Sequence, residues 1–149
     1  MARINIVAIH KIAESSLEGK IIADYLKRIP WKVTVQQLEL KDKFPPERLK
    51  IYEGELLLKA VPAGSFVIAL DERGLQFTSH DFYGLIEKQT QPISFIIGGA
   101  YGLSDELKSR VNLLVSLSAM TMPHALARVV LVEQIYRSFT ISQNHPYHK

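Results

Sequence analysis

The 149-residue sequence contains no cysteine. Disulfide bonds, thiolate metal ligands and cysteine nucleophiles are therefore excluded, and we expect no metal site. Long hydrophobic runs are also missing, since none approaches the roughly 20 residues that span a bilayer, so we expect no membrane partner. The opening "MARINIVAIHK" lacks a small-residue cleavage site and indicates a first strand rather than an export signal. The expected location is the cytoplasm.

Signatures of phosphate binding are missing as well. The sequence has neither an early G-x-G-x-x-G nor a P-loop with its Lys-Ser or Lys-Thr pair. It also has no Lys/Arg-rich block of the kind that forms a nucleic-acid-binding tail. The net charge of +3 is mildly basic, which permits an RNA partner without requiring one.

Hydrophobic residues make up 47% of the chain, and their spacing predicts alternating strands and helices. Strands are expected at Arg3–His10, Trp31–Leu40, Ser65–Leu70, Ile93–Ile97 and Asn112–Leu117. Helices are expected at Glu14–Arg28, Glu47–Val61, Ser79–Lys88, Ser104–Arg110 and His124–Ile141. This order is typical of one α/β domain over residues 1–149, with a mostly parallel sheet and helices on both faces.

Three unusual segments follow consecutive predicted strands. They are Leu70–Gly74 ("LDERG"), Gly98–Gly102 ("GGAYG") and Ser118–Pro123 ("SAMTMP"). Because parallel sheets bind ligands beyond the carboxyl ends of their strands, we expect these segments to lie around one site.

The glycine corner, Gly98–Gly102, favours a bound molecule without phosphate. No Lys or Arg stands within it, and Asp105 and Glu106 open the following helix. S-adenosylmethionine fits such a corner, since its adenine needs an apolar slot and its sulfonium tolerates no nearby cation. The alternative is that the glycines only form a turn.

The last predicted helix is apolar nearly all round, which predicts burial on every side. The sheet can cover only one face, so we expect the other to meet a second subunit. Glu133 and Arg137 are i,i+4 neighbours, and an ordinary ion pair is enough to explain them. The tail "HPYHK", His145–Lys149, is either disordered or a clamp that stacks on an unpaired base.

Four segments of the sequence resemble the RlmH family of SPOUT methyltransferases. They are "LDERG" at 70–74, "FIIGGAYGL" at 95–103, "VSLSAMTMPHALARVVLVEQIYR" at 115–137 and "HPYHK" at 145–149. The resemblance covers the whole chain, in matching order and spacing. Members of this family methylate N3 of a pseudouridine in 23S rRNA.

The resemblance implies a SPOUT-type fold with a trefoil knot near the C-terminus, an exception to the rule that chains do not thread loops. It also implies a homodimer that acts on the assembled ribosome, with S-adenosylmethionine as cofactor. The residues that match the family's cofactor contacts are Leu70, Gly99, Ser118, Ala119, Met120, Thr121, Met122 and Pro123.

Arg137, Tyr147 and His148 are the candidate catalytic residues, because an anion that develops on the base gains from a preorganised cation or donor. We expect the tail of one subunit to meet the cofactor of the other. His124 either assists or makes a structural hydrogen bond. No general base is identified, although Asp71 and Glu72 are close to the site in sequence.

Two other functions are weighed. A nucleotide-binding oxidoreductase predicts a phosphate-facing cation and an early G-x-G-x-x-G, which the sequence lacks. A non-catalytic ribosome-binding module predicts eroded cofactor segments, yet all three keep the family's pattern. Tyr101 and Phe77 depart from that pattern. These departures affect the expected fine specificity of the enzyme and not its class.

Overall fold

The structure, a computed structural model, describes residues 1–149. Strands and helices alternate along the chain, as the apolar spacing predicts. The strands are β1 (Arg3–Ile9), β2 (Lys32–Leu38), β3 (Phe66–Gln76), β4 (Ile93–Ile97) and β5 (Leu113–Ser116). The helices are α1 (Leu17–Arg28), α2 (Pro46–Ala60), α3 (Ser79–Glu87), α4 (Asp105–Lys108) and α5 (His124–Ser142).

The strands form one sheet in the order β2-β1-β4-β3-β5, and every neighbouring pair is parallel. Alternate side chains of β1 enter two separate cores. Ile4 and Ile6 belong to the larger core, whereas Val7 and Ile9 belong to the smaller one. The expected α/β fold with a parallel sheet covered on both faces is therefore confirmed.

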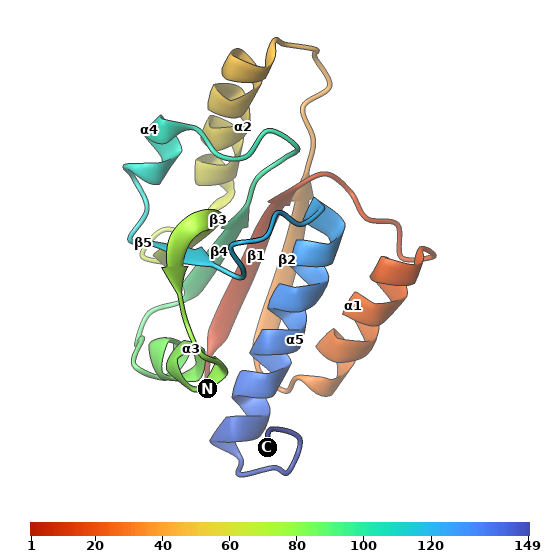
Figure 1. Ribbon diagram of the computed structural model, residues 1–149, viewed down its shortest axis with the longest axis vertical. Helices are drawn as coiled ribbons and strands as arrows, with labels where there is room; N and C mark the ends of the chain where they lie inside the picture. The colour runs from red at the N-terminus through yellow and green to blue at the C-terminus, as the bar shows by residue number, and fades with distance from the viewer.

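The helices divide between the two faces of the sheet (Figure 1). α5 packs between α1 and α3 over the larger core, and α2 packs with α4 over the smaller one. None of the five helices combines the length and the apolar character needed to cross a membrane.

Two helix starts differ from the predictions because a side-chain cap sets the boundary. α1 begins at Leu17 instead of Glu14, since the Ser16 hydroxyl accepts a hydrogen bond from the Gly19 N–H. At α3 the cap is Thr78, which accepts from the Asp81 N–H, and Ser79 is already the first helical residue. Pro46 opens α2, as the Pro45-Pro46 pair predicts.

Leu70–Gly74 was expected to be a turn, and this expectation is wrong. β3 continues through it to Gln76, with a register shift against β5 between Leu70 and Leu75. The bulge lets the strand keep its pairing while its charged residues leave the sheet plane. These residues still lie beyond the regular part of β3, at the edge where β4 and β5 end.

The reason given for a second subunit against α5 is also wrong. α1 and α3 flank the helix, so three sides of it are covered within the chain, by the sheet and by two helices. Leu131, Val132 and Ile135 are buried in this way, while Leu126 in the first turn remains 46% exposed. A helix that lies between two others needs apolar residues nearly all round without any partner chain.

Candidate active site

The three unusual segments meet around one cavity of about 780 Å³, at the carboxyl ends of β3, β4 and β5. Its walls are formed by residues 70–73, 97–103 and 117–124 except Ala119, with Lys50, Lys108 and Ala127 completing them. The volume lies in the range of small-molecule sites. The expectation that the three segments share one site therefore agrees with the geometry.

Most of the predicted cofactor residues line this cavity. Those that do are Leu70, Gly99, Ser118, Met120, Thr121, Met122 and Pro123. Ala119 does not, because the Ser118 hydroxyl accepts a hydrogen bond from the Met120 N–H and this short turn leaves Ala119 exposed. Met120 is 78% exposed at the cavity mouth, so its thioether is free to cover a bound molecule.

The glycine corner is a tight turn closed by a hydrogen bond from the Gly102 N–H to the Gly99 carbonyl at 3.1 Å. Gly102 has a φ of 81°, in the left-handed region that favours glycine. At Gly99 the requirement is different: an added Cβ would lie only 2.8 Å from Oε2 of Glu53. The corner therefore presents bare main chain to the cavity.

Acidic side chains of β3 hold the cavity walls together. Asp71 pairs with Lys108 of α4 at 2.8 Å, and the Glu72 carboxylate accepts a hydrogen bond from the Thr121 hydroxyl at 2.8 Å. Burial alone would raise the pKa of Asp71, but the hydrogen bond and charge of Lys108 and the N–H of Arg73 outweigh it and lower that pKa. Neither carboxylate is free to act as a general base in this arrangement.

Lys50, Arg73 and Lys108 all line the cavity, although the glycine corner itself contains no cation. The premise that no cation faces this site is therefore wrong, because α2, β3 and α4 contribute cations from outside the corner. Lys108 is neutralised by Asp71, and Lys50 lies 3.6 Å from Glu47. Paired lysines at a cavity wall weaken the case for a diphosphate site without excluding one.

His124, where α5 begins, has a structural environment. Its ring lies 4.5 Å from the ring of His10, and both are close to the guanidinium of Arg128. Burial lowers the pKa of His124, and the neighbouring His10 and Arg128 lower it further. His124 is therefore held neutral between β1 and α5.

The three predicted catalytic residues come together, with Glu133, at the other end of α5. Arg137 donates to both carboxylate oxygens of Glu133, at 3.3 Å and 3.0 Å, and its Nη1 lies 3.1 Å from Nδ1 of His148. Tyr147 donates to Glu133 at 2.9 Å and lies under the Arg137 guanidinium. The tail is thus folded onto α5, and the expectation of a disordered tail does not match this structure.

The Glu133 carboxylate is the common hydrogen-bond partner of Arg137 and Tyr147. The hydrogen bonds to Glu133 raise the pKa of Arg137, so its charge is permanent. Burial raises the pKa of Tyr147, and its hydrogen bonds with Tyr25 and Glu133 raise it further. Tyr147 is therefore a hydrogen-bond donor at any physiological pH, not a base.

The cluster and the cavity lie far apart within the chain. His124 lines the cavity, and Arg137 follows 13 residues later on the same helix, which is roughly 20 Å at 1.5 Å per residue. Figure 1 shows the C-terminus at the lower end of α5, while the helix begins beside the upper ends of the strands. One chain alone does not bring its tail to its own cavity.

Sequence reasoning missed several polar residues of the site. Lys50, Glu53 and Lys108 reach it from α2 and α4, and Arg128 supports it from below. Only the three-residue spacing of Lys50 and Glu53 hinted at a shared helical face. The signal for Arg128 is its place as a charged residue on a helix that is apolar nearly all round, where it has to be paired or used, but the sequence does not identify its partners.

The residues that line the cavity fit S-adenosylmethionine by their chemistry. Leu70, Met120 and Met122 offer an apolar slot, and bare main chain at Gly99 supplies hydrogen-bonding groups at its edge. Oε1 of Glu53, directly behind Gly99, has no hydrogen-bond partner within the chain. An adenosyl group suits this set, and the cationic Arg73 lines the same cavity without an ion-pair partner.

Comparison with known proteins places the chain among methyltransferases. The family described as "Predicted SPOUT methyltransferase" matches residues 2–148. "Ribosomal RNA large subunit methyltransferase H" of Syntrophotalea carbinolica is 47% identical over 85% of this chain and 86% of its own. The protein of the same name from Clostridium botulinum strain Langeland is 41% identical over 98% and 99%.

A solved structure, "a probable methylase family protein from Haemophilus influenzae Rd KW20", has the same fold. Its TM-score is 0.55 at 16% identity, over 96% of this chain and 67% of that one. Neither the oxidoreductase nor the non-catalytic module is favoured by these relatives. The resemblance seen in the four sequence motifs is confirmed, and the chain belongs to the SPOUT methyltransferase family.

Proposed function

We propose that this protein transfers a methyl group from S-adenosylmethionine to N3 of a pseudouridine in 23S rRNA, on the assembled ribosome in the cytoplasm. The observation that carries the proposal is the meeting of three strand-end segments around one cavity. The names of the relatives identify rRNA as the class of substrate.

Different residues of the cavity bind different parts of the cofactor. Leu70, Met120 and Met122 enclose the adenosyl group, and the main chain at Gly99 hydrogen-bonds to its polar edges. Ser118, Thr121 and Pro123 shape the third wall, while Ala119 supports the turn from outside. When bound, the cofactor supplies an electrophilic methyl group on a sulfonium.

The chain's own contribution to the reaction is orientation and charge. Loss of the N3 proton to solvent would leave negative charge on the base. In-line attack on the methyl carbon would then consume that charge as the bond between carbon and sulfur breaks and the neutral thioether leaves. Arg137, oriented by Glu133, and the donors of Tyr147 and His148 stabilise that charge. Holding the two reactants in line accounts for several kcal/mol more of the barrier.

A homodimer explains how the tail reaches a cofactor. Because cavity and tail cluster lie at opposite ends of α5, we place the tail of one subunit over the cavity of its partner. Leu126 and Met120 are exposed apolar side chains beside the cavity, which a partner would cover. We further propose that the segment after β4 threads an earlier loop to form the trefoil knot of this family.

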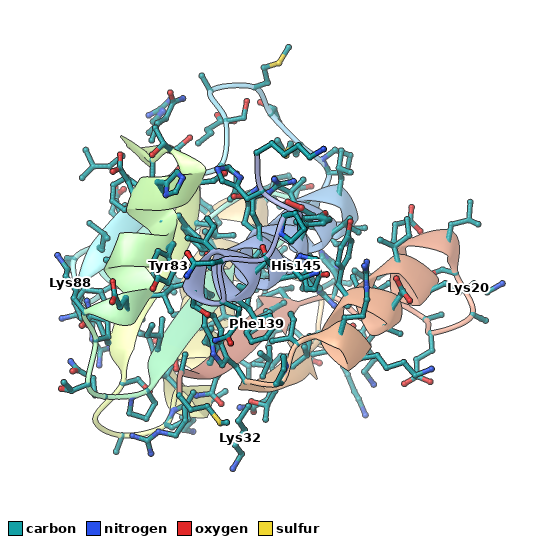
Figure 2. All side chains as sticks on the ribbon, turned by 90° about the horizontal axis from the view of Figure 1, so that it is seen from below. Lys20, Lys32, Tyr83, Lys88, Phe139 and His145 are labelled. Carbon is teal, nitrogen blue, oxygen red and sulfur yellow. The ribbon has the colours of Figure 1, made fainter.

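We propose that the RNA binds on the surface of the homodimer. Seen from below, Lys20, Lys32 and Lys88 point outward around the central Phe139 and His145 (Figure 2). Arg28, in contrast, is held by Asp24 at 3.2 Å and lies over Tyr25 and Tyr136, so it is less available. Scattered lysines suit a pre-shaped ribosomal surface better than free RNA.

The proposal is tested by incubating the purified protein with methyl-labelled S-adenosylmethionine and ribosomes from a strain that lacks this methylation. The expected result is label on one 23S rRNA pseudouridine, resistant to chemistry that needs a free N3. Ribosomes that already carry the methyl group, and naked 23S rRNA, serve as controls and should take up little label. Label on another nucleotide, or none, contradicts the proposal.

A further inference from the structure

A carboxyl group lies inside the molecule directly behind the glycine corner. It belongs to Glu53 of α2, a residue only 5% exposed, and its Oε1 has no hydrogen-bond partner. Burial raises the pKa of Glu53, because nothing nearby replaces the lost water. A buried acid without a partner is costly, so its presence beside the cavity needs a reason.

The carboxyl group and the glycine corner are closely fitted. A Cβ at Gly99 would lie 2.8 Å from Oε2 and 2.9 Å from Oε1 of Glu53, so an alanine at residue 99 would force the Glu53 carboxyl group to shift. One turn earlier on α2, Lys50 lines the cavity itself. Leu57, one turn later, packs with Leu103 and Leu107 in the smaller core and holds α2 in place.

The corner offers donors for such an acceptor. Its Gly102 N–H is used within the turn, but the N–H groups of Ala100 and Tyr101 form no hydrogen bond within the chain. Both residues are exposed, so water can reach this part of the corner while the cavity is open. A ligand that covers the corner removes that water and leaves main-chain donors in need of acceptors.

We propose that Glu53 is a positioning residue of the cofactor site: its carboxyl group accepts hydrogen bonds from main-chain N–H groups of Gly98–Gly102 in the cofactor-bound state and so fixes the corner from behind. Glu53 acts through Gly99, since it does not line the cavity. The proposal rests on the proposed function only in taking S-adenosylmethionine as the bound molecule.

The first test is calorimetry with S-adenosylmethionine and its demethylated product on the full-length variants. Glu53→Ala should weaken both by about tenfold or more, equal to the loss of one charged or buried acceptor. Glu53→Gln keeps an oxygen acceptor and should stay within about threefold of wild type. Glu55→Ala, an exposed acid on the same helix, is the matched control and should bind normally.

Several outcomes overturn the proposal. If Glu53→Ala binds S-adenosylmethionine with wild-type affinity, Glu53 has no positioning role. If Glu53→Ala and Glu53→Gln lose affinity equally, the charge of residue 53 matters and its oxygen acceptor does not. In turnover assays the KM for S-adenosylmethionine should rise while kcat at saturation is kept; a fall in kcat alone also contradicts the role. Thermal unfolding of each variant checks that the fold is intact.

A double variant separates positioning from packing. Gly99→Ala puts a methyl group against the Glu53 oxygens and should lose affinity, and Glu53→Ala removes the atoms that it meets. If Glu53 only fills space, the double variant regains wild-type affinity, which overturns the proposal. If Glu53 fixes the corner, the double variant binds no better than Glu53→Ala. If Glu53→Ala does not fold, Gly99→Ala alone tests the contact with Glu53. Wild-type affinity of Gly99→Ala for S-adenosylmethionine then overturns the proposal.

Amide hydrogen exchange distinguishes this proposal from the assignment of the cofactor. If wild type binds neither S-adenosylmethionine nor its product, the proposed function fails by itself. With S-adenosylmethionine bound, the amides of residues 98–102 should exchange faster in Glu53→Ala than in wild type or Glu55→Ala, because the hydrogen bonds to Glu53 form in that state. Equal exchange rates in all three contradict the role of Glu53.

Discussion

At the level of single residues, the ion pair between Asp71 and Lys108 gives the cavity a dependence on pH. In the folded protein the pKa of Asp71 is lowered from its ordinary value of 3.8. The ion pair therefore stabilises the fold fully above pH 3.8, and this stabilisation is lost as the pH falls through the lower pKa of the folded state. We expect Asp71→Asn to be less stable than wild type at pH 7 and the difference to narrow below about pH 4.

Urea unfolding of both proteins between pH 7 and pH 3 measures this effect. Asp105→Asn, an exposed acid at the start of α4, controls for the change of charge near Lys108. A difference between wild type and Asp71→Asn that does not vary with pH would show that Asp71 contributes through packing alone.

Arg137 is the residue whose removal should separate chemistry from binding. The charge that it places at the reacting base is needed only as negative charge develops, so Arg137→Ala should lower turnover by about 100-fold. Affinity for S-adenosylmethionine should change by less than about twofold, because Arg137 does not line the cavity of its own chain. Single-turnover kinetics and calorimetry measure the two quantities. Unchanged turnover would remove Arg137 from the catalytic residues.

Some of the strands could be predicted from the local sequence pattern, whereas others depend on contacts between residues that are distant in sequence. The run Ile93–Ile97 is apolar throughout and became a fully buried strand, as predicted. Leu70–Gly74 reads as a turn because Asp71, Glu72 and Arg73 are polar, and the pairing of Leu70 and Leu75 with β5 on either side carries the strand across it. Strand pairing depends on partners distant in sequence, which periodicity does not reveal.

The same limit applied to the site. The glycine spacing identified the corner, and strand order placed three segments at one edge, so the cavity could be predicted. Glu53 could not, because only the packing of α2 behind the corner brings it to Gly99. The docked tail was missed for a similar reason, since Tyr147 is held by Glu133 and Tyr25 from two different helices.

Arg128 fixes the start of α5 to the sheet, and this joint can be tested. It is 1% exposed, donates to the carbonyl of His10 at 2.9 Å and to Gln37, and has no carboxylate partner. His10 itself has a φ of 76°, an uncommon conformation that this bond helps to hold. Arg128→Ala leaves these buried acceptors unpaired, so we expect a loss of about 2–4 kcal/mol in the free energy of unfolding.

Urea denaturation monitored by circular dichroism checks this value. Arg48→Ala on the exposed face of α2 is the control and should change stability by less than about 0.5 kcal/mol. If Arg128→Ala lowers the free energy of unfolding by less than about 0.5 kcal/mol, water or a local rearrangement replaces the hydrogen bonds of the guanidinium.

For the whole molecule, the separation of cavity and tail along α5 makes subunit exchange informative. One variant, Arg137→Ala, has an intact cavity and a defective tail; a second, with Gly99→Ala, has an intact tail and a glycine corner that is displaced by the contact with Glu53. Each homodimer should be nearly inactive on ribosomes. If the tail of one subunit serves the cavity of the other, a mixed dimer contains one complete site out of two.

Unfolding and refolding the two variants together in equal amounts should therefore restore about one quarter of wild-type activity, because half of the dimers are mixed and each has one working site. Sedimentation of the wild type at assay concentration should first give the mass of two 16.9 kDa chains. A site built within one chain would leave every mixture inactive, since each subunit then has its own defect. Activity in the mixture would locate the reacting base between two subunits, where the charge of Arg137 meets a methyl group held by its partner.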